Sequence, residues 1–165
     1  MMMLRLLATL AATLAMTSAM AGQVEPGDVG KLSDCLETRA GTGCIGTIAE
    51  PCADDAGRST VQMVQCMQRE TEAWDVILNE QWPALMADAK ERDKLNEPEA
   101  NGLPSSAKSL REAQRAWIAF RDAECLYAYS EWGVGSFRNI AAAGCQRDMT
   151  AKRVIEFHAR LNREG

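Results

Sequence analysis

The sequence contains one histidine, His158, among its 165 residues. Histidine-rich metal centres need several such side chains, and catalysis by a serine or cysteine usually needs a histidine base. The chain alone therefore cannot build a multi-histidine metal centre, and any histidine base would have to be His158. We expect His158 to be an ordinary surface or half-buried residue, because it follows Phe157 on an expected helix with no nucleophile motif nearby.

Several patterns that identify enzymes are also absent. The sequence has no C-x-x-C, H-E-x-x-H or G-x-S-x-G motif and no phosphate-binding glycine loop. The short glycine run at 133–136 follows no strand pattern, so it does not indicate a nucleotide site. The 23 acidic residues include no pair that the sequence singles out for glycoside hydrolysis. We therefore expect no cofactor, no metal and no catalytic activity.

No apolar run reaches the length of about 20 residues that spans a membrane. The apolar run at 6–16 follows Arg5 and precedes Ala19-Met20-Ala21, which is the order of features in a secretory signal peptide. We expect residues 1–21 to be such a peptide, cleaved before Gly22, rather than a membrane anchor. No cysteine follows the expected cleavage site to carry a lipid. The mature chain is expected to be periplasmic or secreted, with no membrane anchor.

Positive charge is scarce in the expected mature chain, which has 17 basic against 23 acidic residues once Arg5 is removed, a net charge of −6. Nucleic acids and anionic lipids bind basic surfaces, so neither is expected as a partner. The charge is uneven: residues 22–101 hold 7 basic and 16 acidic residues, and residues 102–165 hold 10 and 7. Either the halves pack together and neutralise each other, which we favour, or an acidic surface faces a basic partner.

Cysteine, in contrast, is abundant, and an even number in an exported chain predicts three disulfides. The six are Cys35, Cys44, Cys52, Cys66, Cys125 and Cys145. They allow fifteen connectivities. Cys125 and Cys145 lie near the end of one expected helix and the start of the next, so a bridge there would close a corner and contribute about 3 kcal/mol in the chain-entropy model. Cys66 could tie back to Cys52, leaving Cys35 with Cys44, and the other connectivities stay open.

Apolar periodicity predicts helices and no strands. Residues 22–59 show no sustained period and are expected to be loops pinned by disulfides, with a short helical turn at 32–39. A helix is expected over 60–94, with a kink or break near Gln81-Trp82 because Pro83 lacks the N–H that helix interiors need. The fold class is therefore all-α: a small antiparallel helical bundle at 60–165 behind a disulfide-stapled, cysteine-rich N-terminal segment at 22–59.

Two more helices complete the expected bundle. The second runs from an N-cap at Ser105 or Ser106 to about Glu131. Its apolar stripe is Leu110, Ala113, Trp117, Phe120 and Tyr127. An irregular stretch is expected from the glycine run to Gly144, and the third helix is expected from Asp148 or Thr150 to about Asn162.

The strongest local pattern is Gln114-x2-Trp117-x3-Arg121-Asp122, because its intervals of three and four place the first three side chains on one helix face. A buried arginine needs a partner. We expect Arg121 to pair with a carboxylate of the first long helix, which offers Glu70, Glu72 and Asp75. We favour a role in organising the core over a role in binding a ligand.

Three motifs together resemble the LprI-like N-terminal domain family of small exported proteins. They are Cys66-Met-Gln-Arg-Glu70 with Trp74-Asp75 and Leu78-Asn79, Leu110 with Gln114 to Cys125, and Gly135-Ser136 with Cys145 and Thr150-x2-Arg153. The resemblance covers roughly residues 44–161 and implies a disulfide-stapled helical fold and inhibition of lysozyme, which would be the protein partner. The chain differs from the family's named type in having no lipid-accepting cysteine, and from its usual uninterrupted helix in having Pro83.

Charge gives this implied activity a physical basis. Host-type lysozyme is strongly basic and cuts its substrate with two carboxylates, so an acidic chain would be steered towards it. The loop at 133–139 is a candidate plug for the lysozyme cleft, in which Ser136 could hydrogen-bond a catalytic carboxylate and Arg138 could pair with it. The simpler interpretation of this loop is a turn between two helices. The competing function is a structural or adaptor protein that binds an envelope partner through a helical face.

Overall fold

The chain folds into α-helices, and no strand occurs in residues 23–38, 41–97 and 102–164, which this computed structural model describes. The helices are α1 (Asp28–Thr38), α2 (Ala49–Asp55), α3 (Thr60–Asn96), α4 (Ser106–Ser130) and α5 (Phe137–Leu161), with short 3-10 turns η1 (Thr42–Cys44) and η3 (Asn162–Glu164). The predicted all-α bundle with a disulfide-stapled N-terminal segment is confirmed. The expected signal peptide at 1–21 lies outside the described residues.

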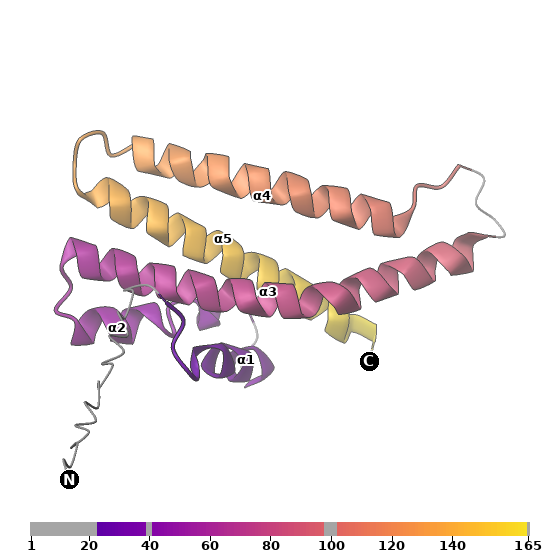
Figure 1. Ribbon diagram of the computed structural model, residues 1–165, viewed down its shortest axis with the longest axis horizontal. Helices are drawn as coiled ribbons and strands as arrows, with labels where there is room; N and C mark the ends of the chain where they lie inside the picture. Colours follow the sequence, from indigo (N-terminus) through magenta and orange to yellow (C-terminus); the bar gives the residue numbers. More distant parts are fainter. Residues whose placement is uncertain (1–22, 39–40, 98–101, 165) are drawn as a thin grey trace, which may run out of the picture.

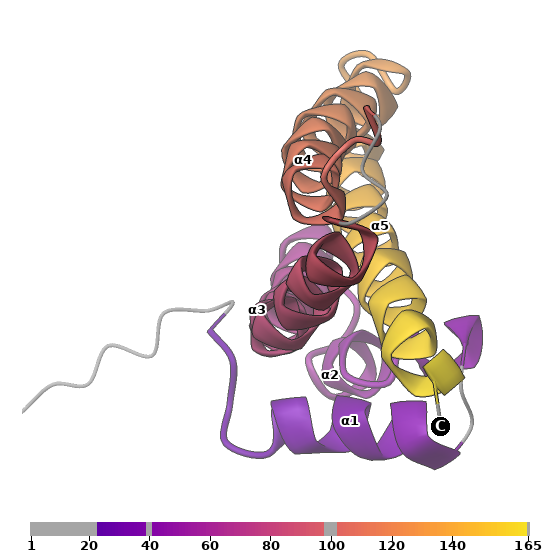
Figure 2. The ribbon, with the colours of Figure 1, turned by 90° about the vertical axis from the view of Figure 1, so that its right-hand side faces the viewer.

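The helices form three layers (Figures 1 and 2). Helices α3 and α5 lie side by side in the middle, α4 covers one side, and α1 and α2 lie on the other. In Figure 1 the chain runs from left to right along α3, back from right to left along α4 and again from left to right along α5, so α4 is antiparallel to both of its neighbours. Within the described residues, no helix is long and apolar enough to cross a membrane.

Helix α3 begins at a capping box, in which the Ser59 hydroxyl accepts from the Gln62 N–H and the Gln62 side chain accepts from the Ser59 N–H. Of the predicted kink or break near Gln81-Trp82, the break does not occur, because α3 runs continuously through Pro83. Figure 1 shows that α3 bends along its second half as it approaches α4. A proline removes one backbone hydrogen bond, and the helix here continues because Leu85, Met86 and Ala89 beyond it are buried.

The main core joins the two ends of the sequence. Trp74 of α3 and Phe157 of α5 are fully buried in it, and Leu32 of α1 packs against the same cluster. The apolar period predicted for 60–94 therefore faces the core, as Ile77, Leu78, Leu85 and Met86 also show. The cysteine-rich segment is thus part of one continuous core with the long helices and does not sit apart from them.

Helix α4 begins as predicted, with Ser105 as its N-cap. Asp93 of α3 also holds this end, since its carboxylate accepts from the Ser105 hydroxyl at 2.7 Å and the Ser106 N–H at 2.5 Å. The predicted apolar stripe of this helix is partly wrong. Phe120 and Tyr127 are each 58% exposed, because α4 packs on the bundle along one side only.

Helix α5 begins at Phe137, shortly after the end of α4, so the predicted irregular stretch up to Gly144 is wrong. Alanines at 141–143 favour helix, and they continue it through Gly144. A Cβ on Gly144 would lie 3.8 Å from the Met67 Sδ, so this glycine sits where α5 approaches α3. The lack of a side chain at Gly144 allows α5 to pack closely against α3, and the helix continues through this residue.

The N-terminal segment is more helical than its sequence indicates. Residues 32–38 of the predicted helical turn belong to α1, residue 39 lies outside the described residues, and α2 was not predicted. These helices have 11 and 7 residues, and α1 buries only Leu32 and Leu36 from its apolar residues, which is too few to show a period. Pro51 lies in the first turn of α2, where no backbone N–H needs an intrahelical partner.

The three disulfides join Cys35 to Cys44, Cys52 to Cys66 and Cys125 to Cys145. The favoured Cys125–Cys145 bridge and the suggested pairing of the other four are thereby confirmed. Cys145 lies inside the helical range that begins at Phe137, so this bridge clamps α4 and α5 within their length. The first two bridges tie α1 to η1 and α2 to α3.

Candidate functional site

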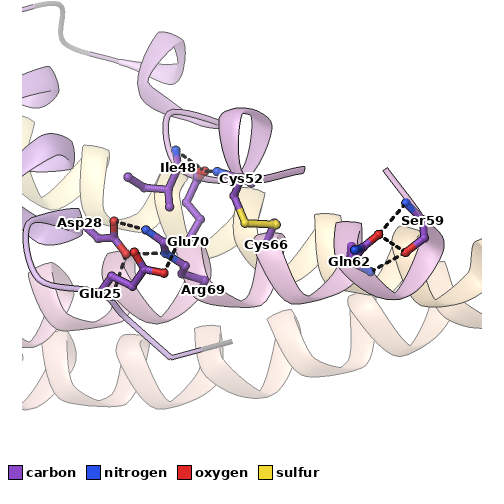
Figure 3. The surroundings of a disulfide bond; sticks show 10 residues. Glu25, Asp28, Ile48, Cys52, Ser59, Gln62, Cys66, Arg69 and Glu70 are labelled. Carbon is purple, nitrogen blue, oxygen red and sulfur yellow. Dashed lines mark hydrogen bonds and ion pairs between the residues drawn. A yellow bond between two sulfur atoms is a disulfide. The ribbon is translucent and has the colours of Figure 1, made fainter. Parts of the chain in front are cut away.

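A buried carboxylate organises the junction between α2 and α3. Glu70 is fully buried, and its oxygens accept from the backbone N–H groups of Gly46, Ile48 and Ala49 at 2.7 to 3.0 Å. The Trp74 indole Nε1 donates to the same carboxylate at 3.1 Å. Figure 3 shows Glu70 reaching Ile48 beside the Cys52–Cys66 bridge. Every contact of this group is internal, so it supports structure and not binding.

The neighbouring residue Arg69 turns towards a second buried carboxylate. The Asp28 side chain is fully buried and accepts from Arg69 Nε at 2.7 Å and Nη2 at 2.8 Å, and Glu25 accepts from Nη1 at 2.6 Å (Figure 3). The hydrogen bonds from Arg69 hold the pKa of Asp28 below its ordinary value. Asp28 in return raises the pKa of Arg69. This bidentate pair attaches the start of α1 to α3.

The face of α4 that carries Gln114, Trp117 and Arg121 lies against α5. Gln114 is buried and its Oε1 accepts from Arg153 Nε at 3.0 Å. The guanidinium of Arg121 lies 5.1 Å from the Trp117 ring, and that of Arg153 lies 5.5 Å from the same ring. The tryptophan is therefore flanked by one arginine from its own helix and one from α5.

The predicted partner of Arg121 is wrong. Arg121 bonds to Asp122, its neighbour on α4, and to the Thr150 hydroxyl of α5, while Glu70 is occupied by the backbone N–H groups described above. Asp75 lines the same groove as Arg121, but it accepts from Asn79. The reason is the layering, since α5 inserts beside this face of α4 and offers the nearer acceptor.

Replacing Arg121 by methionine is expected to lower the free energy of unfolding by about 1 kcal/mol, because the bond to Thr150 and the stacking on Trp117 are lost. Urea unfolding of the oxidised protein measures this loss. Arg115→Met is the matched control, since Arg115 is an exposed arginine of the same helix. Equal stability of Arg121→Met and the wild type would show that Arg121 does not help to hold α4 on α5.

The turn between α4 and α5 exposes apolar side chains. Val134 is 97% exposed, and Trp132 and Phe137 are about half exposed with ring centroids 4.3 Å apart. We call Trp132, Val134 and Phe137 the hairpin tip. Large apolar side chains gathered on a surface are typical of protein contact sites. The tip is therefore the candidate binding surface.

The two predicted contact residues lie at this turn. Ser136 is the exposed N-cap residue of α5, and its side chain forms no capping bond. Arg138 turns back into its own hairpin, where Nη1 donates to the Gly133 carbonyl at 3.2 Å and the guanidinium lies 5.1 Å from the Tyr129 ring. The structure thus brings both residues beside the hairpin tip, with Arg138 bracing the turn.

No group of three or more histidine, cysteine, aspartate or glutamate side chains within the described residues could hold a metal ion. His158 is half-buried, and its Nε2 lies 2.8 Å from the Asn162 side chain.

The acidic and basic halves of the sequence do not pair their charges in these ion pairs. Each pair joins two residues of the same half, as the pairs of the following arginines show: Arg58, Arg69, Arg121, Arg147, Arg153 and Arg160. The two halves are joined instead by the main core around Trp74 and Phe157 and by the hydrogen bonds of Asp93 at the start of α4.

The sequence did not point to Asp28, Glu70 or Arg153 as organising residues. Glu70 belongs to a motif that the sequence singled out, but only as a partner for Arg121. The available signal was its position four residues after Cys66 and four before Trp74, which places all three on one helix face. Asp28 had no comparable signal, since its partner lies 41 positions away.

Comparison with known proteins identifies the family to which the chain is similar. A family model described as lysozyme inhibitor LprI matches residues 52–157. An uncharacterized protein of Rhizobium meliloti (strain 1021) is 33% identical over 92 residues, which cover 55% of this chain and 66% of that protein. No solved structure matches the chain.

Proposed function

The chain belongs to the LprI lysozyme-inhibitor family, and from this membership we propose that it inhibits lysozyme by binding it, without catalysis. The family match is the main support for this proposal. The three disulfides are also consistent with an oxidising compartment outside the cytoplasm, which is where a lysozyme would be encountered. A stapled bundle also binds with little loss of conformational entropy, because its surface is already ordered.

We place the lysozyme contact at the hairpin tip. Trp132, Val134 and Phe137 expose apolar area on a turn that Arg138 braces and the Cys125–Cys145 bridge anchors. A rigid protruding turn fits a cleft, and aromatic anchors contribute most of the affinity in many protein interfaces. Ser136 lies within this turn and offers a hydroxyl to a carboxylate of the lysozyme cleft.

Charge supports the approach of a basic enzyme. Exposed acidic residues occur on α1, α2 and α3 up to its middle, and include Asp34, Glu37, Glu50, Asp55, Glu72 and Glu80. Two basic residues of this region, Arg58 and Arg69, are paired with carboxylates, and Lys31 is exposed among the acidic side chains. Such a surface raises the association rate with a basic protein and makes that rate sensitive to salt.

Substitutions in the tip test this contact. Val134→Asp and Trp132→Ala are expected to weaken inhibition of lysozyme by about tenfold or more, because they remove apolar contact or place an unpaired charge in it. The measurement is the rate of cell-wall lysis by lysozyme against the concentration of oxidised inhibitor. Leu95→Asp is the matched control. Leu95 is also highly exposed, but it lies near the C-terminal end of α3 and not in the turn between α4 and α5.

Arg138→Glu tests the bracing of the turn, since it removes the bond to Gly133 and the contact with Tyr129 and reverses the charge beside the tip. We expect it to weaken inhibition together with the tip variants. If the wild type leaves lysis unchanged at tens of micromolar, inhibition by this chain is wrong. If the wild type inhibits and all three variants inhibit equally well, the hairpin tip is not the contact.

The adaptor function remains the second candidate, favoured by the exposed apolar side of α4. Phe120 and Tyr127, seven positions apart on one side of that helix, are each 58% exposed. An adaptor would bind an envelope protein through this face and leave lysozyme unaffected. Loss of that binding in Phe120→Glu, with no inhibition by the wild type, would favour the adaptor.

A further inference from the structure

A cavity of about 710 Å³ lies between the second half of α3, the first half of α4 and the end of α5. These three segments meet at the end of the bundle away from the α4–α5 turn (Figures 1 and 2). Leu85 and Leu110 line the apolar part of the cavity, and its charged lining consists of one carboxylate, Asp88, which pairs with Arg92, and the arginines Arg92, Arg153, Arg160 and Arg163. A volume of this size suits a small organic ligand.

The three arginines that α5 and η3 bring to the cavity outnumber the carboxylates that pair with them. Arg153 and Arg160 both pair with the single carboxylate of Glu156. Arg163 forms no ion pair with any described residue, and its Nε donates to the Ala159 carbonyl at 3.3 Å. Three cations that share one anion leave an excess of positive charge on this wall, in a protein whose total charge is negative.

Arg153 is the best-placed of these cations. It is 9% exposed, and its guanidinium is held by Gln114, by Glu156 and by the Phe157 ring at 4.4 Å. Burial alone would raise the pKa of Glu156, but the hydrogen bonds from Arg153 and Arg160 outweigh it and lower that pKa. The Nη2 group of Arg153 forms no hydrogen bond with a described residue, so it is available at the cavity wall. A preorganised guanidinium fork of this kind matches an oxyanion.

We infer that this cavity binds a small organic anion, with its carboxylate or phosphate group on Arg153, Arg160 and Arg163 and its apolar body against Leu85 and Leu110. Ser109 of α4 also lines the cavity and adds a hydroxyl donor. Exposed arginines alone would attract any anion, whereas the leucines require a ligand with an apolar part. The site lies away from the hairpin tip, so the inference does not depend on inhibition of lysozyme.

Three probes with the same alkyl chain test the site: hexanoate, hexyl phosphate and hexanol, with inorganic phosphate as the anion without an apolar body. Binding is followed by amide chemical shifts of the ¹⁵N-labelled, oxidised protein at constant ionic strength. At least one of the two hexyl anions should bind, with shifts at Leu85, Ala89 and Ala113, and should bind more tightly than hexanol and inorganic phosphate. The stronger of the two identifies the natural head group as a carboxylate or a phosphate.

Variants fix the location of this binding. Arg160→Gln with Arg163→Gln should weaken the stronger probe by about tenfold, because charge-assisted hydrogen bonds are lost. Arg111→Gln with Arg115→Gln is the control, since these are exposed arginines of α4 outside the cavity. Ala113→Leu should also weaken binding by filling the cavity without changing its charge. Hexanol binding as tightly as both anions, absence of shifts with both, or equal binding in the two double variants would overturn the inference.

Discussion

Replacing Glu70 by alanine is expected to lower the free energy of unfolding by about 3 to 5 kcal/mol, the largest effect of any single side chain in the α2–α3 junction. The carboxylate is fully buried and accepts from three backbone N–H groups and one indole N–H. Without it, these donors lie in a site closed to solvent and lose their partners. Urea unfolding of the oxidised protein, followed by far-ultraviolet circular dichroism, measures the loss.

Glu70→Gln tests whether shape or acceptor chemistry dominates. The amide keeps the volume but replaces one acceptor oxygen by an NH2 group, which would face a backbone N–H. We expect a loss of stability smaller than that of Glu70→Ala. Glu72→Ala is the control, because Glu72 is exposed on the same helix and its removal should change stability by less than about 0.5 kcal/mol. A Glu70→Ala protein as stable as the control would show that the junction does not rely on this carboxylate.

The loop that binds Glu70 tolerates little change of sequence at Gly46. Gly46 adopts a φ of 96°, and its N–H donates to Glu70 at 2.7 Å. A Cβ at this position would lie 2.9 Å from the Glu50 Cδ, so a larger residue would meet both strain and a close contact. The loop between η1 and α2 thus depends on one glycine and one carboxylate, 24 positions apart.

The long helices could be predicted because their signals are local. The period of Trp74, Ile77 and Leu78, the hydroxyl of Ser105 and the turn residues after Ser130 all act within a few positions. The start of α5 was missed because Gly144 looks like a helix end, while the contact with Met67 that accounts for it comes from a helix far away in sequence. Periodicity alone cannot reveal such a packing reason.

In the candidate sites, too, features with local sequence signals could be predicted, and features that depend on contacts distant in sequence could not. The cysteine spacing and the compartment were enough to favour Cys125–Cys145, and the turn that carries Ser136 and Arg138 was found from its glycines. The partner of Arg121 could not be predicted. Periodicity shows which face of α4 carries this side chain, but it does not show whether α3 or α5 lies closer to that face. The arginine cavity was likewise hidden, since its lining comes from three helices separated by long stretches of sequence.

The second large effect concerns the Asp28–Arg69 pair. Asp28→Asn is expected to lower the free energy of unfolding at pH 7 by about 3 kcal/mol, because removing one partner leaves the other charge poorly paired beside a buried side chain. Arg69→Met should destabilise at least as much, since it leaves a fully buried carboxylate without its guanidinium. Both variants are compared with the wild type by urea unfolding.

The pH dependence of this loss has a defined sign. The pKa of Asp28 is lowered in the folded protein by the hydrogen bonds from Arg69, so folding favours the ionised carboxylate. The contribution is therefore complete above the unfolded pKa of about 4 and disappears as the pH falls through the lower folded value. The stability difference between the wild type and Asp28→Asn should be constant from about pH 7 to 5 and should shrink below about pH 4.

Asp34→Asn supplies the control for this acid range, because Asp34 is an exposed aspartate of the same helix α1. Its stability should follow that of the wild type at each pH. A difference between the wild type and Asp28→Asn that persists unchanged to about pH 2 would mean that the amide disturbs packing and that the ion pair contributes little. A difference that shrinks with acid, absent in the control, would show that the charge of Asp28 attaches α1 to the bundle.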